Sequence, residues 1–438
     1  MCLKSGELSE SGCIHSDVLI AGGGPAGMMA AIGARHAARL DGCPDDRFVV
    51  TLLERNPRAG VKIRISGGGK CNVTHEGSVG ELLSKGFRRK GEQRFLRRAL
   101  HAFSNRDLAE LLLKRGVGTA ARDDGKVFPV SERSEDVLAA LEEELRDANV
   151  SVVTGERVLR AETAGGGFVV YTAGRVYCAK TFVLATGGLS WSRTGTTGDG
   201  LGIAGALGHR IVPPSPALAP VFLKPPPSPS LAGISLRDVV LVIRDSKHSF
   251  SRRGDLLFTH KGISGPACLS ISRDAAGITC GEGAEAGVDF FPGETVESLD
   301  SQLIASASTH GGQLVKTFLR HKTPVPLALV PEVLRRSGIA ADQRWGELKK
   351  TARRSLLQTL KFFRIGELEA IPLDAGEVSA GGISLDETDS KTMESRIRKG
   401  LFFCGEILDY AAEIGGFNLQ AAFSTGWLAG LNCYPVQE

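Results

Sequence analysis

The stretch GGGPAG, which begins at Gly22, constrains the fold of this chain more than any other feature. It lies between residues 17–21, typical of a buried parallel strand, and residues 25–40, typical of a helix with proline in its first turn. Gly22 then allows a tight turn, Gly24 lets backbone N–H groups approach a pyrophosphate, and Gly27 lets helix and strand pack closely. The pattern predicts a dinucleotide-binding βαβ unit, with a purely structural glycine turn as the alternative.

The next strand ends on an acid, as dinucleotide-binding units require. Residues 48–54 form an apolar run that ends at Glu54, whose carboxylate is placed to accept hydrogen bonds from a ribose. Two further glycine turns follow strand-like runs, ATGG at residues 185–188 and CGEILD at residues 404–409. Three turns at strand ends suit a long ligand, so the sequence predicts FAD rather than a nicotinamide cofactor alone.

A second, permanent NAD(P) domain is not predicted. The later glycine-spaced motif GEGAEAG, residues 281–287, precedes the apolar VDFFPG instead of a helix. NAD(P)H is therefore expected to visit the flavin only transiently.

The length of 438 residues exceeds one typical core, and the composition shifts abruptly in the middle. Eight prolines between Pro213 and Pro229 are expected to exclude helix and central strand and to mark a domain crossing. Residues 237–292 are typical of strands and residues 296–368 of basic helices. The predicted fold class is α/β, a Rossmann-like FAD-binding domain interrupted by a β-rich insertion. The predicted domains are a tail at 1–16, FAD-binding parts at 17–210 and 371–438, an inserted β-rich domain at 211–295, and its helical subdomain at 296–370.

Composition bounds the location and the partners. The nine cysteines form no CxxC pair, and their odd number and wide spacing favour reduced thiols in a cytoplasm. No signal peptide or membrane-length apolar run is legible, so a soluble, cytoplasmic protein without a membrane partner is expected. No metal site is predicted, and a net charge of +4 does not by itself require a polyanionic partner.

Two side chains are candidates for catalysis. Cys71 lies beside Lys70 in SGGGKCNVTH, where a lowered pKa would make the thiol a nucleophile or an acid. The alternative is a small buried residue where the backbone turns beneath the flavin. His260 in FTHKGISGP either protonates a substrate or bonds a backbone carbonyl to hold a domain crossing.

Four long motifs carry a family resemblance: ERNPRAGVKIRISGGGKCNVTH, ATGGLSWSRTGTTGDG, GDLLFTHKGISGPA and MESRIRKGLFFCGEILDYAAEIGGFNLQAAFSTG. With these motifs the chain resembles the BaiN-like family of FAD-dependent oxidoreductases, which includes aminoacetone oxidase and a ribosomal RNA dihydrouridine synthase. The resemblance implies an FAD domain split by an insertion with a β subdomain and a helical subdomain, and a flavin beside the Gly381–Gly382 turn. The turns and the resemblance together predict as cofactor-binding residues Gly22, Gly24, Pro25, Ala26, Gly27, Glu54, Arg55, Lys62, Ser66, Gly67, Gly68, Lys70, Cys71, Asn72, Ala185, Thr186, Gly187, Gly188, Gly405, Glu406, Asp409, Gly415, Gly416, Asn418, Leu419 and Gln420.

Two basic stretches leave the substrate open. Residues 85–98 hold seven basic residues in fourteen and residues 349–364 hold six in sixteen, either as phosphate-binding surfaces or as solvated helix faces. One expected function is transfer of hydride from reduced flavin to a substrate double bond, with NAD(P)H as donor and uridine in ribosomal RNA as substrate. A second is a small-molecule amine or ketone oxidase or reductase that uses dioxygen or NAD(P)H. A non-catalytic FAD-binding electron carrier is disfavoured, because the inserted domain would have nothing to cover.

Overall fold

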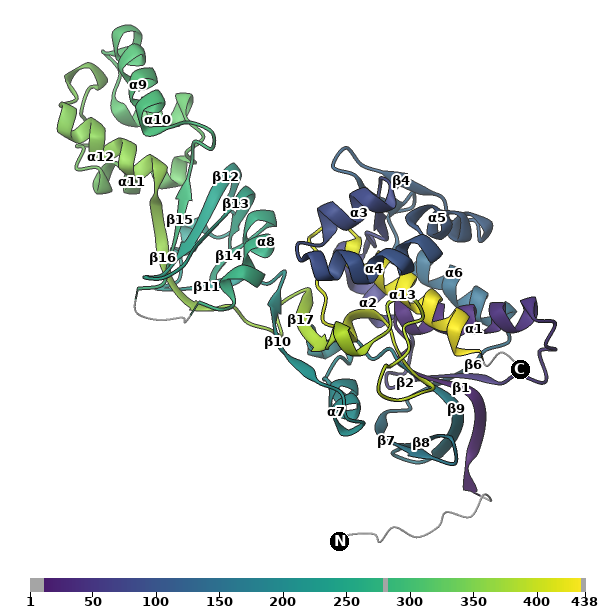
Figure 1. Cartoon of the computed structure of the whole chain (residues 1–438). Coiled ribbons are helices and arrows are strands. Elements are labelled where there is room, and N and C mark those ends of the chain that lie inside the picture. The colour runs from purple at the N-terminus through teal and green to yellow at the C-terminus, as the bar shows by residue number, and fades with distance from the viewer. Residues whose placement is uncertain (1–11, 279–282, 435–438) are drawn as a thin grey trace. The chain divides into compact units, whose positions relative to one another are not determined.

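The computed structural model describes residues 12–278 and 283–434, which form two compact units (Figure 1). Unit 1 contains residues 12–214 and 378–434, and unit 2 contains residues 215–377. Unit 2 is therefore an insertion between two parts of unit 1. The predicted fold class, a Rossmann-like domain interrupted by a β-rich insertion, is confirmed.

The main sheet of unit 1 has the order β6-β2-β1-β9-β8-β7, and β18 also pairs with β9. Its parallel strands are β1 (Ile14–Ala21), β2 (Val50–Glu54), β6 (Ser151–Thr154), β9 (Val176–Leu184) and β18 (Leu401–Phe403). An antiparallel meander adds β7 (Val158–Ala164) and β8 (Gly167–Thr172) to the first half of β9. The carboxyl ends of β1, β2, β9 and β18 thus meet at one edge, where ligands bind in such sheets.

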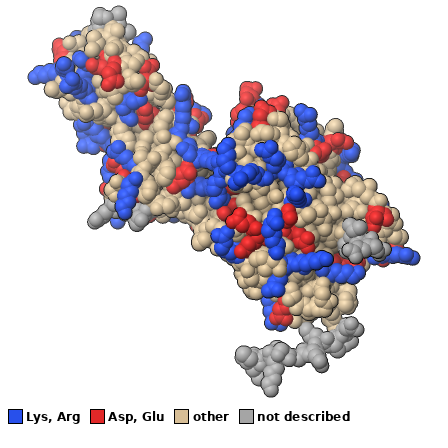
Figure 2. Space-filling view, viewed as in Figure 1, with Lys and Arg blue, Asp and Glu red and all other residues tan. Residues whose placement is uncertain are grey.

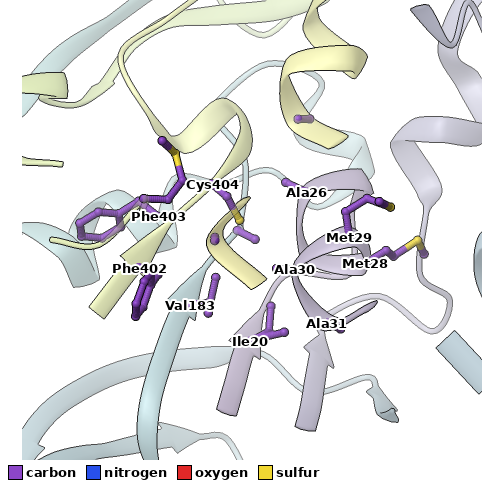
Figure 3. Packing of buried hydrophobic residues seen from close by; sticks show 14 of the residues in the cluster. Ile20, Ala26, Met28, Met29, Ala30, Ala31, Val183, Phe402, Phe403 and Cys404 are labelled. Atoms are coloured by element: carbon purple, nitrogen blue, oxygen red, sulfur yellow. The ribbon is translucent and has the colours of Figure 1, made fainter. Parts of the chain in front are cut away.

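The core of unit 1 lies between this sheet and the helices α1 (Pro25–Leu40) and α13 (Phe417–Cys433). Ile20, Val183 and Phe402 share one register across β1, β9 and β18, and Figure 3 shows Ile20 and Val183 beside Ala30 of α1. Small residues let the two helices approach closely, because a β-carbon at Gly430 would lie 2.3 Å from the Ala30 carbonyl oxygen. The close contact joins the first helix of the chain to the last.

Further elements of unit 1 surround the sheet. They are α2 (Val61–Ile65), α3 (Val79–Gly86), α4 (Lys90–Ala102), α5 (Asn105–Lys114), α6 (Ser134–Asp147) and α7 (Asp199–Ala206), with a small sheet of β3 (Thr74–His75), β5 (Lys126–Pro129) and β4 (Thr119–Ala121). The helical run from residue 95 to 113 is two helices. The Ser104 hydroxyl accepts from the Asp107 N–H, while the Asp107 carboxylate accepts from the Ser104 N–H, so a capping box starts α5 there.

Unit 2 is a closed barrel with helices. The barrel has the order β11-β14-β13-β12-β15-β16, with β11 (Val221–Lys224), β12 (Ser235–Arg244), β13 (Ser249–Phe258), β14 (Gly262–Ser264), β15 (Glu285–Asp289) and β16 (Phe363–Ala370). The helices are α8 (Pro266–Ala275), α9 (Val296–His310), α10 (Val315–Lys322), α11 (Val330–Arg336) and α12 (Lys350–Lys361). Both sets pack around one hydrophobic cluster.

The proline-rich segment contains β10 (Ile211–Ala217), which pairs with β17 (Val378–Ile383) in a two-stranded sheet and is therefore an edge strand, not a central one. Two local predictions are wrong. Helix α8 interrupts the segment expected to be strands, because Gly265 turns with φ 90° and Pro266 suits a first helical turn. Strand β16 closes the barrel at the end of the segment expected to be helical.

The expectation of reduced thiols is wrong for one pair. Cys13 and Cys178 form a disulfide between the start of β1 and the neighbouring strand β9, with a Cα–Cα distance of 5.9 Å. The wide sequence separation that suggested free thiols is bridged because the two strands are adjacent in the sheet. The other described cysteines, Cys43, Cys71, Cys268, Cys404 and Cys433, are free.

Two expectations reach beyond the described residues. Residues 1–11 of the predicted N-terminal tail lie outside them, and β1 begins within the rest of that tail, at Ile14. Residues 281–282 of GEGAEAG also lie outside them, and β15 begins within the rest of that motif, at Glu285. Within residues 12–278 and 283–434, no helix has the length and apolarity to cross a membrane, and no group of three or more His, Cys, Asp or Glu is arranged to hold a metal ion.

Candidate functional site

The turn between β1 and α1 leaves a helix N-terminus bare. Gly24 caps α1 without a side-chain hydrogen bond, and a β-carbon there would meet no atom within 4 Å. A β-carbon at Gly27 would lie 1.9 Å from the Gly22 carbonyl oxygen, so the helix packs directly on the turn. The unpaired N–H groups of the first turn, which include those of Ala26 and Gly27 behind Pro25, face open space suited to an anion.

Glu54 ties the end of β2 to that turn. The buried carboxylate accepts hydrogen bonds from the Gly23 N–H (2.8 Å) and the Asn56 N–H (2.7 Å). Each carboxylate oxygen keeps a further lone pair, so Glu54 can still accept from a ribose hydroxyl. The neighbouring Arg55 turns away and donates to the Thr197 hydroxyl (2.6 Å), beside a groove of about 380 Å³ lined by β7 and α7.

The SGGGKC loop is shaped by left-handed backbone. Gly67, Gly68 and Gly69 have φ of 57°, 67° and 87°, and Cys71 has φ of 57°. A β-carbon at Gly68 would meet no atom within 4 Å, so the loop presents bare backbone to open space. Ser66 closes the loop from the other end, where its carbonyl accepts from the Cys71 N–H (3.0 Å). The glycines suit close approach of a flat ligand.

The lowered pKa expected for Cys71 is wrong. Lys70 points away from the thiol and pairs with Glu132 (2.6 Å) at the surface. Cys71 is fully buried, and this burial raises the pKa of its thiol to about 11, with a smaller opposing effect of its hydrogen bond to Ser66. The thiol is therefore protonated at neutral pH and does not act as a ready nucleophile.

The ATGG turn leaves one buried polar atom without a partner. Ala185 continues the sheet by donating to the Ala21 carbonyl (2.9 Å), and Gly187 has φ of 76°. The Thr186 hydroxyl is buried and has no hydrogen-bond partner among the described residues. A buried hydroxyl without a partner can still form a hydrogen bond with a ligand at this turn.

Glu406 is the centre of a polar cluster. Its Oε2 accepts from Lys62 Nζ (2.5 Å), and its Oε1 accepts from the Ser190 hydroxyl (3.0 Å) and the Ser379 N–H (2.9 Å). Gly405, before it, packs on α1, since a β-carbon there would lie 2.7 Å from that of Ala26. Four distant segments thus meet beside the glycine turn of α1.

Asp409 is already paired within the protein. Its Oδ1 accepts from Arg89 Nη2 (2.9 Å) and from the Gly381 N–H (3.2 Å), and its own N–H donates to the Ile383 carbonyl (2.9 Å). Arg89 also pairs with Glu92 (2.7 Å), whose side chain is almost fully buried. Asp409 therefore holds β17 and the start of α4 in place.

The start of α13 meets the SGGGKC loop. The Asn72 amide satisfies its neighbours when its oxygen accepts from the Gly416 N–H (3.0 Å) and its nitrogen donates to the Thr74 carbonyl (2.9 Å). Gly415 and Gly416 have φ of 140° and 86°. The helix cap at Gly416 carries no side-chain hydrogen bond, so the N-terminus of α13 is bare like that of α1.

Two predicted cofactor residues in α13 are occupied by protein partners. Asn418 accepts from the Ala412 N–H (2.9 Å), and Gln420 is fully buried, accepting from the Thr74 hydroxyl (2.6 Å) and donating to the Phe103 carbonyl (3.1 Å). Leu419 packs against the core of unit 1. These side chains shape the site rather than offer free polar groups to it.

His260 belongs to unit 2 and not to unit 1. It is exposed in the loop between β13 and β14 of unit 2, whereas the other predicted residues belong to unit 1. Its role as a proton donor stays a prediction.

Sequence reasoning missed Ser190, Ser379 and Arg89. Ser190 follows the ATGG turn closely, and its position there was a usable signal. Ser379 gave none, because its partners Leu189 and Glu406 lie far away in the sequence. In the sequence, nothing distinguishes Arg89 from the other positive charges of the basic stretch at residues 85–98.

The basic face of α4, defined as Lys90, Arg94, Arg97 and Arg98, is a separate feature of unit 1. All four side chains are exposed, and none forms an ion pair with a described residue. The opposite side of the helix is buried through Phe95, Leu96, Ala99 and Leu100. Figure 2 shows Lys and Arg side chains gathered over α3 and α4.

These observations fit FAD. The two bare helix ends, the open space at Gly24 and Gly68, the acid at the end of β2 and the orphaned Thr186 hydroxyl match the needs of a pyrophosphate, a ribose and a flavin. The fold and the site define a Rossmann-type FAD-binding protein.

The profile described as HI0933-like protein Rossmann domain matches residues 16–432, so the chain belongs to the HI0933-like family. A 3-dehydro-bile acid delta(4,6)-reductase of Clostridium scindens is 32% identical over 415 residues, which cover 94% of this chain and 97% of the relative. A ribosomal RNA dihydrouridine synthase of Escherichia coli is 29% identical over 415 residues, which cover 94% of this chain and 96% of the relative. The resemblance predicted from the motifs is confirmed, and the chain is an FAD-dependent oxidoreductase.

Solved structures resemble the chain more distantly. A 3-ketosteroid-delta4-(5alpha)-dehydrogenase from Rhodococcus jostii RHA1 is 16% identical with a TM-score of 0.47, and the match covers 97% of each chain. E. coli quinol fumarate reductase is 16% identical with a TM-score of 0.49, covering 97% of this chain and 70% of that chain.

Proposed function

We propose that this oxidoreductase adds hydrogen across a carbon–carbon double bond of uridine in ribosomal RNA, with NAD(P)H as the electron donor. The observation that supports an RNA substrate is the basic face of α4, whose four cations have no acidic partner among the described residues. Unpaired cations clustered on one helix face suit a phosphate backbone. The synthase named among the relatives acts on the same class of substrate.

The residues of unit 1 bind and orient the cofactor in this proposal. When bound, reduced FAD supplies a hydride to one carbon of the double bond. The bare N-terminus of α1 takes the pyrophosphate, Glu54 accepts from the ribose, and Gly67 and Gly68 allow the backbone to pass close to the ring. The target base must leave its stack to reach such a site.

A proton must reach the other carbon of the double bond, and Cys71 and His260 are the candidates. The raised pKa of Cys71 keeps its proton in place at neutral pH, but its burial makes the thiolate left behind costly. His260 is exposed, and an imidazole side chain can act as a general acid. If Cys71 is only a packing residue, Cys71→Ser keeps full turnover while His260→Gln slows it by roughly 100-fold.

Deletion of the gene followed by mapping of dihydrouridine in ribosomal RNA tests the substrate. One or more sites are expected to revert to uridine and to regain modification when purified protein, FAD and NADPH are added to the RNA. Unchanged RNA in the deletion strain contradicts the proposal. Purified protein that stays colourless after incubation with FAD and desalting contradicts the FAD site itself.

A small-molecule reductase or oxidase is the second candidate. The reductase of a 3-dehydro-bile acid named above supports it, because that relative covers nearly the whole chain at 32% identity. Rapid peroxide formation from small amines, or NADPH oxidation by small enones or ketones without RNA, favours this function.

We also propose a cytoplasmic location, because an RNA substrate requires it. Cell fractionation checks this location.

A further inference from the structure

Ser379, in β17, lies between two turns of the FAD site that are far apart in sequence. Its hydroxyl accepts from the Leu189 N–H (3.0 Å), directly after the ATGG turn. The Ser379 N–H (2.9 Å) and hydroxyl (3.3 Å) both donate to Glu406 Oε1, in the CGEILD turn. The serine is 2% exposed, so these bonds form away from water.

The ATGG turn is built around this hydroxyl. A β-carbon at Gly188 would lie 2.0 Å from Ser379 Oγ, so only glycine leaves room for the serine at this position. The Gly188 backbone and the Ser379 hydroxyl are therefore in close contact. Ser379 joins the two turns through a contact that admits no larger residue.

The bonds from Ser379 also fix the Glu406 carboxylate. Ser379 and Ser190 donate to Oε1, while Lys62 donates to Oε2 (2.5 Å). With donors on both oxygens the carboxylate is held in one orientation. A group held in this way before the ligand arrives does not have to be ordered on binding.

We propose that Ser379 is a positioning residue for FAD, acting through Glu406 rather than by touching the chemistry. The inference rests on FAD binding by unit 1, and it assigns a role to the strand along which the chain returns from unit 2. Without the hydroxyl, the Leu189 N–H loses its acceptor and Glu406 loses one donor. The two turns then reach the cofactor without a common anchor.

The dissociation constant of FAD from apo-protein, measured by quenching of flavin fluorescence, tests this role. Ser379→Ala is expected to weaken FAD binding roughly 10-fold, the size of a lost hydrogen bond to a charged group. The matched control is Ser384→Ala, a serine equally buried beside β17 whose hydroxyl accepts from Arg210 (2.5 Å) outside the turns. It should keep FAD affinity within about twofold even where it lowers the melting temperature of the apo-protein as much.

A double-mutant cycle with Glu406→Ala separates positioning from general destabilisation. If Ser379 acts through Glu406, Ser379→Ala costs less than about threefold in affinity when Glu406 is already alanine. An equal loss in both backgrounds, or no loss in the wild-type background, overturns the inference while FAD binding stands. Wild-type protein that binds no FAD overturns the FAD site as well. Should Ser379→Ala fail to fold, Ser379→Cys keeps the volume and is measured in the same way.

Discussion

Two basic helices of similar composition use their charges differently. In α12 and the start of β16, three of the cations face acids: Arg353 pairs with Asp300 (2.6 Å), Lys361 with Asp289 (2.6 Å) and Arg364 with Glu285 (2.7 Å). The basic face of α4 has no such partner among the described residues. A basic stretch in a sequence therefore says little about phosphate binding until the acids that fold against it are known.

The stretch that contains α4 is itself divided. Arg88 pairs with Glu413, and Arg89 with Glu92 and Asp409, so both lie against residues 409–413 at the end of CGEILD and just after it. Lys85, Lys90, Arg94, Arg97 and Arg98 are exposed and form no ion pair with another described residue. Two of the seven basic residues thus support the FAD site, and the other five remain available to a polyanion.

The largest effect is expected when the positive charges on the basic face of α4 are removed, which tests the difference between α4 and α12. Replacing Arg94, Arg97 and Arg98 with glutamine is expected to weaken binding of an unmodified ribosomal RNA transcript on the order of 100-fold near physiological salt. The slope of log affinity against log salt should fall by about 3, which fluorescence anisotropy measures. The matched variant replaces Lys349, at the N-cap of α12, and Lys350 and Arg354 within it, three exposed cations that have no acidic partner among the described residues either. Equal losses in the two variants would remove the distinction between the helices.

A new acid on α4 should make it resemble α12. Gly91 is exposed in the first turn and a β-carbon there meets no atom within 4 Å, so Gly91→Glu fits and places a carboxylate three residues before Arg94. RNA affinity is expected to fall about fivefold. Gly91→Ala is the control, because it should raise stability by about 0.5–1 kcal/mol without changing affinity. Comparable RNA binding by both variants would contradict the role of the face.

Removing an acid from unit 2 should affect stability and not binding. Asp300→Asn breaks the partly buried pair with Arg353, whose side chains are 29% and 20% exposed. The free energy of unfolding of unit 2 is expected to fall by about 0.5–1 kcal/mol, measured by urea denaturation. RNA affinity should stay within about twofold, and a marked gain in affinity would mean that α12 also binds RNA.

The smallest expected effect is a pH dependence in α11. Arg335, first, and Arg336 hold the pKa of Glu332 down to about 2, from an ordinary value of 4.5. Because the folded pKa is depressed, the stability from Glu332 is present above about pH 5 and is lost as pH falls through 4.5 toward 2. Urea midpoints of Glu332→Gln should therefore converge on the wild type at low pH. A difference in urea midpoint that stays constant across that pH range would show that protonation of Glu332 does not change the stability.

The parts of the fold that sequence predicted are those with local causes. Residues 25–40 form α1 as expected, and Gly22, Gly24 and Gly27 have the turn, the open space and the close packing that their spacing indicates. The acid at the end of β2 contacts the same turn. The strand, the start of the helix and the shape of the glycine turn are each determined by residues that lie close together in the sequence.

What could not be predicted depends on distant partners or on side-chain direction. Cys71 was given a lowered pKa because Lys70 is adjacent in sequence, yet adjacent side chains diverge and the lysine meets Glu132 instead. Asn418 and Gln420 face acceptors and donors inside unit 1 that no local pattern reveals. The partner of β10 could not be predicted either, because β17 lies far away in the sequence.

The pairing of β10 with β17 has a consequence for how the chain can be cut. The backbone leaves unit 1 after Pro214 and returns at Val378, and a β-carbon at Gly381 would lie 2.5 Å from the Pro213 carbonyl oxygen. The exit and the return are neighbouring strands, so the whole insertion is topologically a very long hairpin loop. Replacing residues 215–377 with a short turn would remove the end of β10 but would give a continuous chain for unit 1.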